Sequence, residues 1–245
     1  MSICNGVDVI LKRYEKVASD HIQNLNVDSL MAEMLARVEM NWQISPRHLA
    51  EKRPSKENWR LERKLDIAPH NESPEKTLEK AIAKLTDWYN QIPTASGLYD
   101  QHSDKLRNID LVHQLSPAHF EFIELKVTSD TPEKAAMEIL QYAVLYVFAC
   151  LHYTEAEKQA KELLGATQVY LRVLAPPAYY WGSNNLQELA TRFNIGLSAF
   201  SETVRAGCQM DFAFWAFPKD FVWPCGEDDL RFAMSRIVPL EWGGG

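Results

Sequence analysis

The chain has 245 residues and a formal net charge of −7, from 26 Lys and Arg against 33 Asp and Glu. This length suffices for one large α/β domain with a sizeable core that needs no disulfide staples. The acidic balance argues against a protein that holds nucleic acid by bulk electrostatics alone, although basic residues can cluster locally and bound cations can invert the field at an acidic site. The four cysteines form no CxxC pair, which favours reduced thiols in or near the core over an iron–sulfur cluster.

Two segments indicate where in the cell the protein is expected: the N-terminus and the most apolar stretch. The first ten residues contain Asn5 and Asp8 and no sustained apolar stretch, which argues against a secretory signal. The most apolar helix candidate, residues 135–151, contains polar side chains and falls short of a membrane-spanning length. We therefore expect a soluble cytoplasmic protein without a membrane partner.

The first third of the chain predicts two amphipathic helices. Apolar residues recur at helical spacing over residues 7–18. The pattern repeats over residues 31–42, after a predicted N-cap at Asp28 or Ser29.

Residues 47–64 form the most basic stretch of the chain and are interrupted by proline. One interpretation is a solvated linker or helix face. The other is a contact to a phosphate backbone, with Trp59 available to stack on a base. We expect residues 1–68 to form an N-terminal helical extension with this basic linker, and residues 69–245 to form the main domain.

The main domain is predicted to open with a helix over residues 73–89. Ser73 is a suitable N-cap, and Pro74 fits the first helical position. On this helix Glu75 falls at the edge of the apolar stripe, where it can look towards whatever the helix packs on, while Glu79 falls farther round.

Residues 109–113 and 120–127 predict two strands, and their short connection suits antiparallel neighbours. Because strand side chains alternate between faces, Glu124 and Lys126 should emerge together on one face. Asp110 is the one acid among the hydrophobic residues of the first strand. The remaining predicted elements, in chain order, are a wide-striped buried helix over 132–151, a helix with a capping box over 154–165, a strand over 168–175, a helix from 184 or 185 that becomes ambiguous near 194–196, and a strand over 211–217. Together they predict an α/β layer domain with a mixed sheet.

Asp110, Glu124 and Lys126, with Glu75 upstream, have the residue types that phosphodiester cleavage by hard cations requires. Carboxylate oxygens suit Mg²⁺ or Mn²⁺. Such an ion can acidify a bound water, neutralise charge on the phosphate and stabilise the leaving oxygen. A neighbouring lysine could orient or deprotonate the attacking water, or hold the phosphate. This hypothesis requires Glu75, Asp110 and Glu124 to converge around one ion-sized space; the alternative is a surface Glu–Lys pair at a sheet edge.

The order of a helix with Glu75, the strand Ile-Asp-Leu-Val, the strand Phe-Ile-Glu-Leu-Lys and a buried helix resembles the PD-(D/E)XK nuclease superfamily, also called restriction-endonuclease-like. That core is a mixed four-stranded sheet flanked by helices, with its Asp and Glu-x-Lys on adjacent strands. The resemblance implies that Asp110 and Glu124 bind the metal and that Lys126 is the third catalytic residue. It also implies that Glu75 is the first-helix acid, with Glu79 as the second choice.

RecB-like branches of this superfamily carry a Gln-x-x-x-Tyr motif on the following helix. The equivalent here is either Glu138 with Tyr142, which has glutamate in place of glutamine, or Gln141 with a tyrosine one step late at Tyr146. Neither matches strictly. The resemblance covers about residues 73–175.

The sequence thus predicts a Mg²⁺- or Mn²⁺-dependent nuclease that hydrolyses phosphodiester bonds, with DNA as the preferred substrate and endonucleolytic cleavage preferred. The alternative is a non-cleaving module that binds nucleic acid or protein on a nuclease-like fold, which the acidic charge and the N-terminal helices favour. Those helices could also mediate a homodimer or bind a protein partner.

Overall fold

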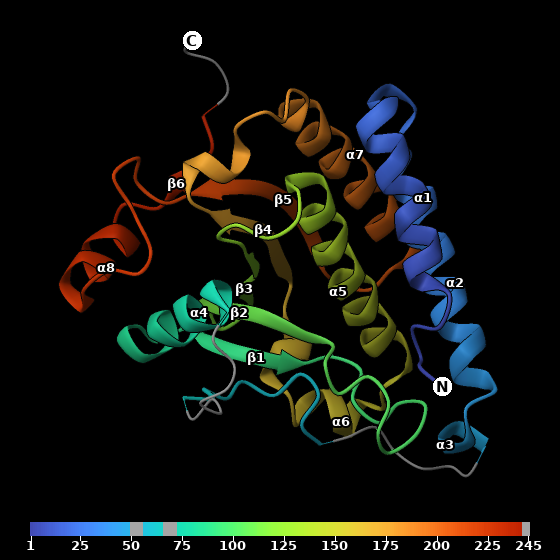
Figure 1. The fold of residues 1–245 in the computed structure, drawn as a ribbon. Coiled ribbons are helices and arrows are strands. Elements are labelled where there is room, and N and C mark those ends of the chain that lie inside the picture. Colours follow the sequence, from blue (N-terminus) through green and yellow to red (C-terminus); the bar gives the residue numbers. More distant parts are fainter. Residues whose placement is uncertain (50–55, 66–72, 242–245) are drawn as a thin grey trace.

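A computed structural model describes residues 1–49, 56–65 and 73–241. Its centre is a six-stranded mixed sheet in which the strands follow one another in chain order (Figure 1). Antiparallel pairing joins the first three strands, parallel pairing adds the fourth and fifth, and the sixth is antiparallel to the fifth. The strands are β1 (Tyr89–Pro93), β2 (Asn108–Ser116), β3 (His119–Leu125), β4 (Gln168–Ala175), β5 (Gln209–Ala216) and β6 (Val238–Pro239).

Helices cover both faces of this sheet (Figure 1). The longest two, α5 and α7, connect the parallel strands, as parallel pairing requires. The α-helices are α1 (Val7–Asp20), α2 (Val27–Gln43), α3 (Pro46–Leu49), α4 (Pro74–Leu85), α5 (Pro132–His152), α6 (Glu155–Gln159), α7 (Leu186–Val204) and α8 (Glu227–Met234), and the 3₁₀ turns are η1 (Ile22–Asn24), η2 (Glu162–Gly165) and η3 (Pro177–Tyr180). The prediction of an α/β domain with a mixed sheet flanked by helices is confirmed.

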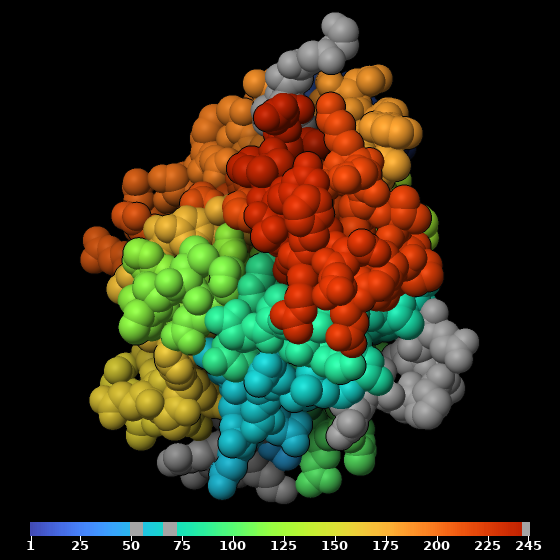
Figure 2. All heavy atoms as spheres, turned by 90° about the vertical axis from the view of Figure 1, so that its left-hand side faces the viewer, coloured from blue at the N-terminus to red at the C-terminus, as the bar shows by residue number. Residues whose placement is uncertain are grey.

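The hydrophobic core has two parts, one on each face of the sheet. The larger part lies between the sheet and α5 and α7, with α1 and α2 packed outside them. The smaller part joins α4 and α8 to the opposite face, and Figure 2 shows α8 in red above α4 in teal on that side of the molecule. β3 contributes to both, since Phe120 and Phe122 enter the larger part while Ile123 and Leu125 enter the smaller one.

The N-terminal helices share the larger core with the sheet. One of these helices approaches α7 closely at Gly196, where an added Cβ would lie 2.5 Å from the Cβ of Val27. This glycine therefore lets α2 lie directly on α7, and α7 continues through the stretch that the sequence left ambiguous.

The helices and strands mostly begin where the sequence predicts, but several differ in extent or capping. The helix predicted over residues 154–165 is two elements, α6 and η2, and the strand predicted over residues 120–127 ends at Leu125. The N-cap of α2 is Asn26, whose side chain accepts a hydrogen bond from the amide of Ser29 at 3.0 Å, and not Asp28 or Ser29 itself. The helix from Ser73 and Pro74 begins as predicted but ends at Leu85. Of the residues expected to continue it, only Tyr89 belongs to β1, a strand that the sequence did not reveal.

Trp59 is not available to stack on a base. Its side chain is fully buried and packs against Phe122 and Tyr146, with ring centroids 6.3 and 5.6 Å away. The described end of the basic stretch also bonds inward, since Arg63 and Lys64 donate to backbone carbonyls near β1. The sequence-based interpretation of Trp59 is therefore wrong; Lys52 and Arg53 lie outside the described residues.

One helix of the described residues, α5, is long and apolar enough to cross a membrane by length and composition. The expectation that this segment is too short does not hold, because the helix has 21 residues. Its most apolar window is 72% buried inside the fold, as in the core helix of a soluble protein, so length alone does not decide its role.

Candidate functional site

The two acids singled out in the sequence lie close to each other on adjacent strands. β2 pairs with β3 so that Leu111 lies opposite Ile123, and Asp110 and Glu124 are the next residues of the two strands beyond this pair. Like charges in that arrangement repel each other unless something compensates them. Part of the compensation comes from the backbone, since Asp110 Oδ2 accepts a hydrogen bond from the Leu125 amide at 3.1 Å.

Glu124 is a buried carboxylate in an environment that disfavours its ionised form. It is 5% exposed, and its Oε1 lies 3.0 Å from Lys126 Nζ. Its Oε2 is buried and has no hydrogen-bond partner within the described part of the chain. Burial, followed by the nearby charge of Asp110, raises the pKa of Glu124 well above its usual range. This carboxylate therefore requires either a proton or a cation.

Lys126 supplies part of that positive charge. Its Nζ lies 2.7 Å from Glu138, 3.0 Å from Glu124 and 3.7 Å from Asp130, in a side chain that is 8% exposed. Burial alone would lower the pKa of Lys126, but Glu124 and Glu138 outweigh it and raise the pKa. The ammonium group of Lys126 is thus held among three carboxylates.

Glu79, on α4, is the first-helix acid that turns inward. It is 1% exposed and accepts hydrogen bonds from Lys76 Nζ, Asn90 Nδ2 and Gln91 Nε2 at 2.9, 3.0 and 2.8 Å. Burial, followed by the charge of Asp110, raises the pKa of Glu79 to about 7. The expectation that Glu79 lies farther round the helix is wrong because β1, which supplies two of its donors, was not foreseen.

Glu75 has a different environment. Its Oε1 accepts the backbone amides of Val127, Thr128 and Ser129 at 3.3, 3.2 and 3.2 Å. Although burial acts the other way, these hydrogen bonds lower the pKa of Glu75. Glu75 therefore anchors the segment after β3, and the structure does not bring its carboxylate together with Asp110 and Glu124. The convergence of three acids that the sequence-based hypothesis requires is therefore absent among the described residues, and Asp110 and Glu124 are the two of the three that lie close together.

Lys76 connects α4 to the acid pair and was not identified from the sequence. Its Nζ lies 2.9 Å from Glu79 Oε2 and 3.4 Å from Asp110 Oδ1. The i,i+3 spacing of Lys76 and Glu79 is a helical ion-pair signal that could have found it.

α5 contributes Glu138, Gln141 and Tyr142 to the same region. Glu138 binds Lys126, and burial, followed by the charges of Glu124 and Asp110, raises the pKa of the Tyr142 hydroxyl well above its usual range. Gln141 Oε1 accepts from Arg107 at 2.8 Å, while its Nε2 is buried with no hydrogen-bond partner in the described part of the structure.

Tyr146, the other candidate for the tyrosine of the helix motif, is a core residue. It is fully buried, and its hydroxyl donates to the Leu163 carbonyl at 3.2 Å. Of the two alternatives, Tyr142 is therefore the tyrosine whose hydroxyl is influenced by the acid pair.

Tyr179, in the turn η3 after β4, is a further member that sequence reasoning missed. Its hydroxyl is buried and unpartnered among the described residues. Burial raises its pKa; among its charged neighbours Lys126 acts against this shift, while Asp130, Glu138 and Glu124 add to it. Glu124 Oε2 and the Tyr179 hydroxyl are thus two buried polar atoms without a hydrogen-bond partner among the described residues, and both belong to side chains that interact electrostatically with Lys126. Buried polar groups are normally hydrogen-bonded, so these two atoms have capacity for a further partner.

A hard divalent cation would find few protein ligands with free oxygens here. Within residues 1–49, 56–65 and 73–241, no three His, Cys, Asp or Glu side chains gather as metal ligands. Mg²⁺, however, usually keeps several waters and takes only one or two protein carboxylates. Asp110 and Glu124 supply two, and the unpartnered Oε2 of Glu124 is the oxygen with coordination capacity left.

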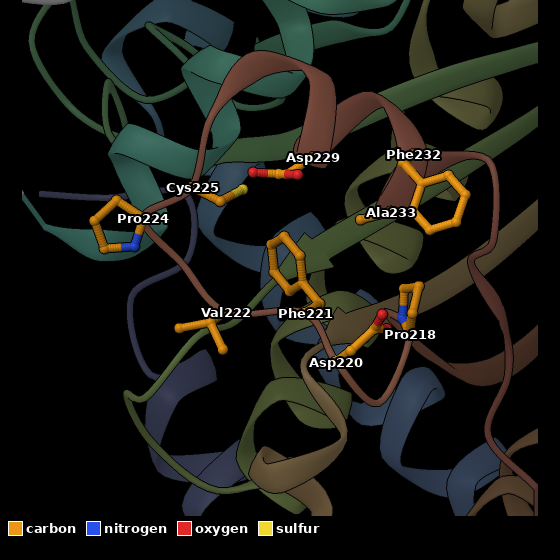
Figure 3. A pocket seen from close by; sticks show the side chains of 9 residues that line it. All are labelled: Pro218, Asp220, Phe221, Val222, Pro224, Cys225, Asp229, Phe232 and Ala233. Carbon is orange, nitrogen blue, oxygen red and sulfur yellow. The ribbon is translucent and has the colours of Figure 1, made fainter.

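A separate pocket of about 380 Å³ lies between the segment after β5 and α8 (Figure 3). Figure 3 shows Cys225 and Asp229 towards one end and Pro218 and Asp220 towards the other. Burial, followed by the charge of Asp229, raises the pKa of Cys225, which makes its thiol a poorer nucleophile. The residues predicted from the sequence do not line this pocket.

Comparisons with family models, with curated proteins and with solved structures found no match to this chain.

Proposed function

We propose that this chain is a metal-dependent nuclease that hydrolyses phosphodiester bonds, with DNA as the substrate and endonucleolytic cleavage as the preferred mode. The observation that carries the proposal is the gathering of Asp110, Glu124 and Lys126 where β2 and β3 lie side by side: Asp110 accepts from the amide of Leu125, next to Glu124; Lys126 Nζ lies 3.0 Å from Glu124; and Glu124 Oε2 is left unpartnered among the described residues. Glu124 is buried and Asp110 is half-buried close to it, and the repulsion between two such carboxylates favours a cationic ligand.

The arrangement of elements supports a restriction-endonuclease-like core as part of this proposal. The order α4, β1, β2, β3, α5, β4 has the acid strand beside the Glu-x-Lys strand, with a helix before them and a buried helix after them. This is the order that the resemblance to the PD-(D/E)XK superfamily implies.

Asp110 and Glu124 would hold Mg²⁺ or Mn²⁺, which when bound supplies Lewis-acid polarisation, charge neutralisation at the phosphate and acidification of water. Lys126 would bind a phosphate oxygen through its ammonium group, held in position by Glu138. Tyr142 and Tyr179 have raised pKa values, so their neutral hydroxyls can donate hydrogen bonds to the same phosphate group. In this proposal Glu75 acts indirectly, through the backbone segment that it anchors after β3.

Nicking of supercoiled DNA in Mg²⁺ or Mn²⁺ tests the proposal. Asp110→Asn and Glu124→Gln, which keep side-chain shape, should each lower the rate by about 100-fold or more. Glu121→Gln is the matched control, because Glu121 is equally buried on β3 but pairs with His113 on the opposite face. It should change the rate by less than about threefold. Full nicking activity in a folded Glu124→Gln protein would contradict the proposal.

Parallel assays with single-stranded DNA, duplex DNA and RNA of one sequence separate the substrate classes. We expect cleavage of DNA and not of RNA. Cleavage of RNA alone would reject the DNA assignment while leaving the phosphodiesterase assignment in place.

One observation favours a second candidate, a non-cleaving binding module. Asp110 and Glu79 are already ion-paired with Lys76, and the described residues bring no third acid to Asp110 and Glu124 as a metal ligand set. This candidate predicts a stable complex with nucleic acid or protein and no divalent-dependent turnover. Cleavage that is lost in Asp110→Asn and Glu124→Gln would exclude it.

A further inference from the structure

We propose that Lys76 competes with the divalent cation for Asp110 and thereby sets the affinity of the site for metal. The inference depends on the proposed function, because it assigns Asp110 to a metal site. It concerns a residue outside the Asp and Glu-x-Lys set, one that lies between two acids of α4 and β2.

The contacts of Lys76 place its ammonium group beside Asp110, where the metal ion itself would have to lie. Its Nζ lies 3.4 Å from Asp110 Oδ1 and 2.9 Å from Glu79 Oε2. In this state the ammonium compensates Asp110. A divalent cation bound to Asp110 would lie close to this positive charge and would be repelled by it. Binding of the cation and the ion pair with Lys76 therefore weaken each other.

Of Lys76 and Lys126, Lys76 is the one whose ammonium group can move away from the acids. Its side chain is 27% exposed, whereas the side chain of Lys126 is 8% exposed and lies within 4.0 Å of three carboxylates. A lysine carries its charge on a flexible four-carbon stem, so Nζ can move to solvent without a change in the backbone.

Both acids keep other donors when Lys76 leaves. Glu79 still accepts from Asn90 and Gln91, and Asp110 still accepts from the Leu125 amide. Displacement of Lys76 therefore leaves neither carboxylate without a hydrogen bond. Lys76 acts as an internal counter-ion whose removal should favour metal binding and should not dismantle the site.

Calorimetric titration of the full chain with Mn²⁺ tests this inference without measuring activity. Lys76→Met, and Lys76→Gln as a second variant should the first fold poorly, is expected to bind Mn²⁺ at least about tenfold more tightly than the parent protein. Lys84→Met is the matched control, because Lys84 is on the same helix and forms an exposed pair with Glu227. It removes the same charge at a distance and should change the affinity by less than about twofold. Asp110→Asn should abolish binding.

The outcomes separate this inference from the function on which it depends. An unchanged Mn²⁺ affinity in both Lys76 variants, with binding still lost in Asp110→Asn, would overturn the role of Lys76 and leave the metal site standing. Parent-like Mn²⁺ binding in Asp110→Asn, or no binding in any protein, would overturn both.

Discussion

Replacement of Glu79 by Gln is expected to change the stability of the protein in a pH-dependent way. The pKa of Glu79 is raised from 4.5 to about 7 in the folded protein, so the fold favours the protonated acid. One pKa unit corresponds to about 1.4 kcal/mol. Ionisation of Glu79 therefore lowers the free energy of unfolding by about 3 kcal/mol once the pH exceeds 7. Gln avoids this cost, while its NH2 group cannot accept the hydrogen bonds made to one Glu79 oxygen, a loss that does not vary with pH.

The sign follows from proton linkage. Below pH 4.5 Glu79 is protonated in both the folded and the unfolded states, so its ionisation costs nothing. The cost grows between pH 4.5 and about 7, while the unfolded state ionises first, and is constant above that range. Urea denaturation of Glu79→Gln and the parent protein, followed by tryptophan fluorescence, should show the stability difference moving in favour of the variant by about 2–3 kcal/mol between about pH 5 and about pH 8.5.

Glu75→Gln, one turn earlier on α4, is the matched control with the opposite sign. The hydrogen bonds of the three backbone amides outweigh burial and lower the pKa of Glu75, so this carboxylate stabilises the fold above its unfolded pKa and loses that effect as the pH falls. Glu75→Gln should therefore be less stable than the parent near pH 8.5, with the difference shrinking towards pH 4. A pH-independent effect of Glu79→Gln, or the same sign for both variants, would refute this reasoning.

Three further substitutions test the packing and the charge balance by the free energy of unfolding in urea. Lys126→Met should cost about 3–5 kcal/mol near pH 8, because it leaves buried Glu124 without its counter-charge. The control is Lys134→Met, at a side chain that is 41% exposed, which should cost less than about 1 kcal/mol. Equal costs for the two variants would contradict the role given to Lys126. Gly196→Ala should cost about 1–3 kcal/mol because its Cβ would meet Val27, and a neutral effect would show that α2 does not lie on α7 as described. Trp59→Ala should cost about 3–5 kcal/mol because its side chain is fully buried. The affinity of the folded variant for labelled DNA, measured by fluorescence anisotropy, should be unchanged. Lost affinity at full stability would show that Trp59 stacks on a base after all.

Local signals in the sequence were sufficient for most of the sheet and its connecting helices. The alternation of Phe120 to Leu125 sets which residues enter each core, and it also directs Glu124 towards the α5 side. The caps at Ser73 and Thr131, each followed by proline, are the start signals that α4 and α5 use.

The missed features depend on tertiary partners. Tyr89 and the residues after it become a strand because they pair with β2, which local propensity does not reveal. Without β1, the burial of Glu79 could not be foreseen, since Asn90 and Gln91 are its donors. Tyr179 reaches the acidic centre only because the parallel pairing of β3 and β4 brings the ends of these strands together.

Trp59 illustrates the opposite error. In the sequence it lies among basic residues, which favours a nucleic-acid contact, yet burial of its large ring against Phe122 and Tyr146 outweighs the polarity of its neighbours. Composition over a short stretch describes the average environment and not that of one aromatic side chain.

The most direct test of the acidic site is anomalous diffraction from a crystal of the protein soaked in Mn²⁺. The account predicts an anomalous difference peak bounded by Asp110 and Glu124, with the Lys76 ammonium group displaced from Asp110. A peak at other carboxylates, with no peak between Asp110 and Glu124 at saturating Mn²⁺, would contradict it.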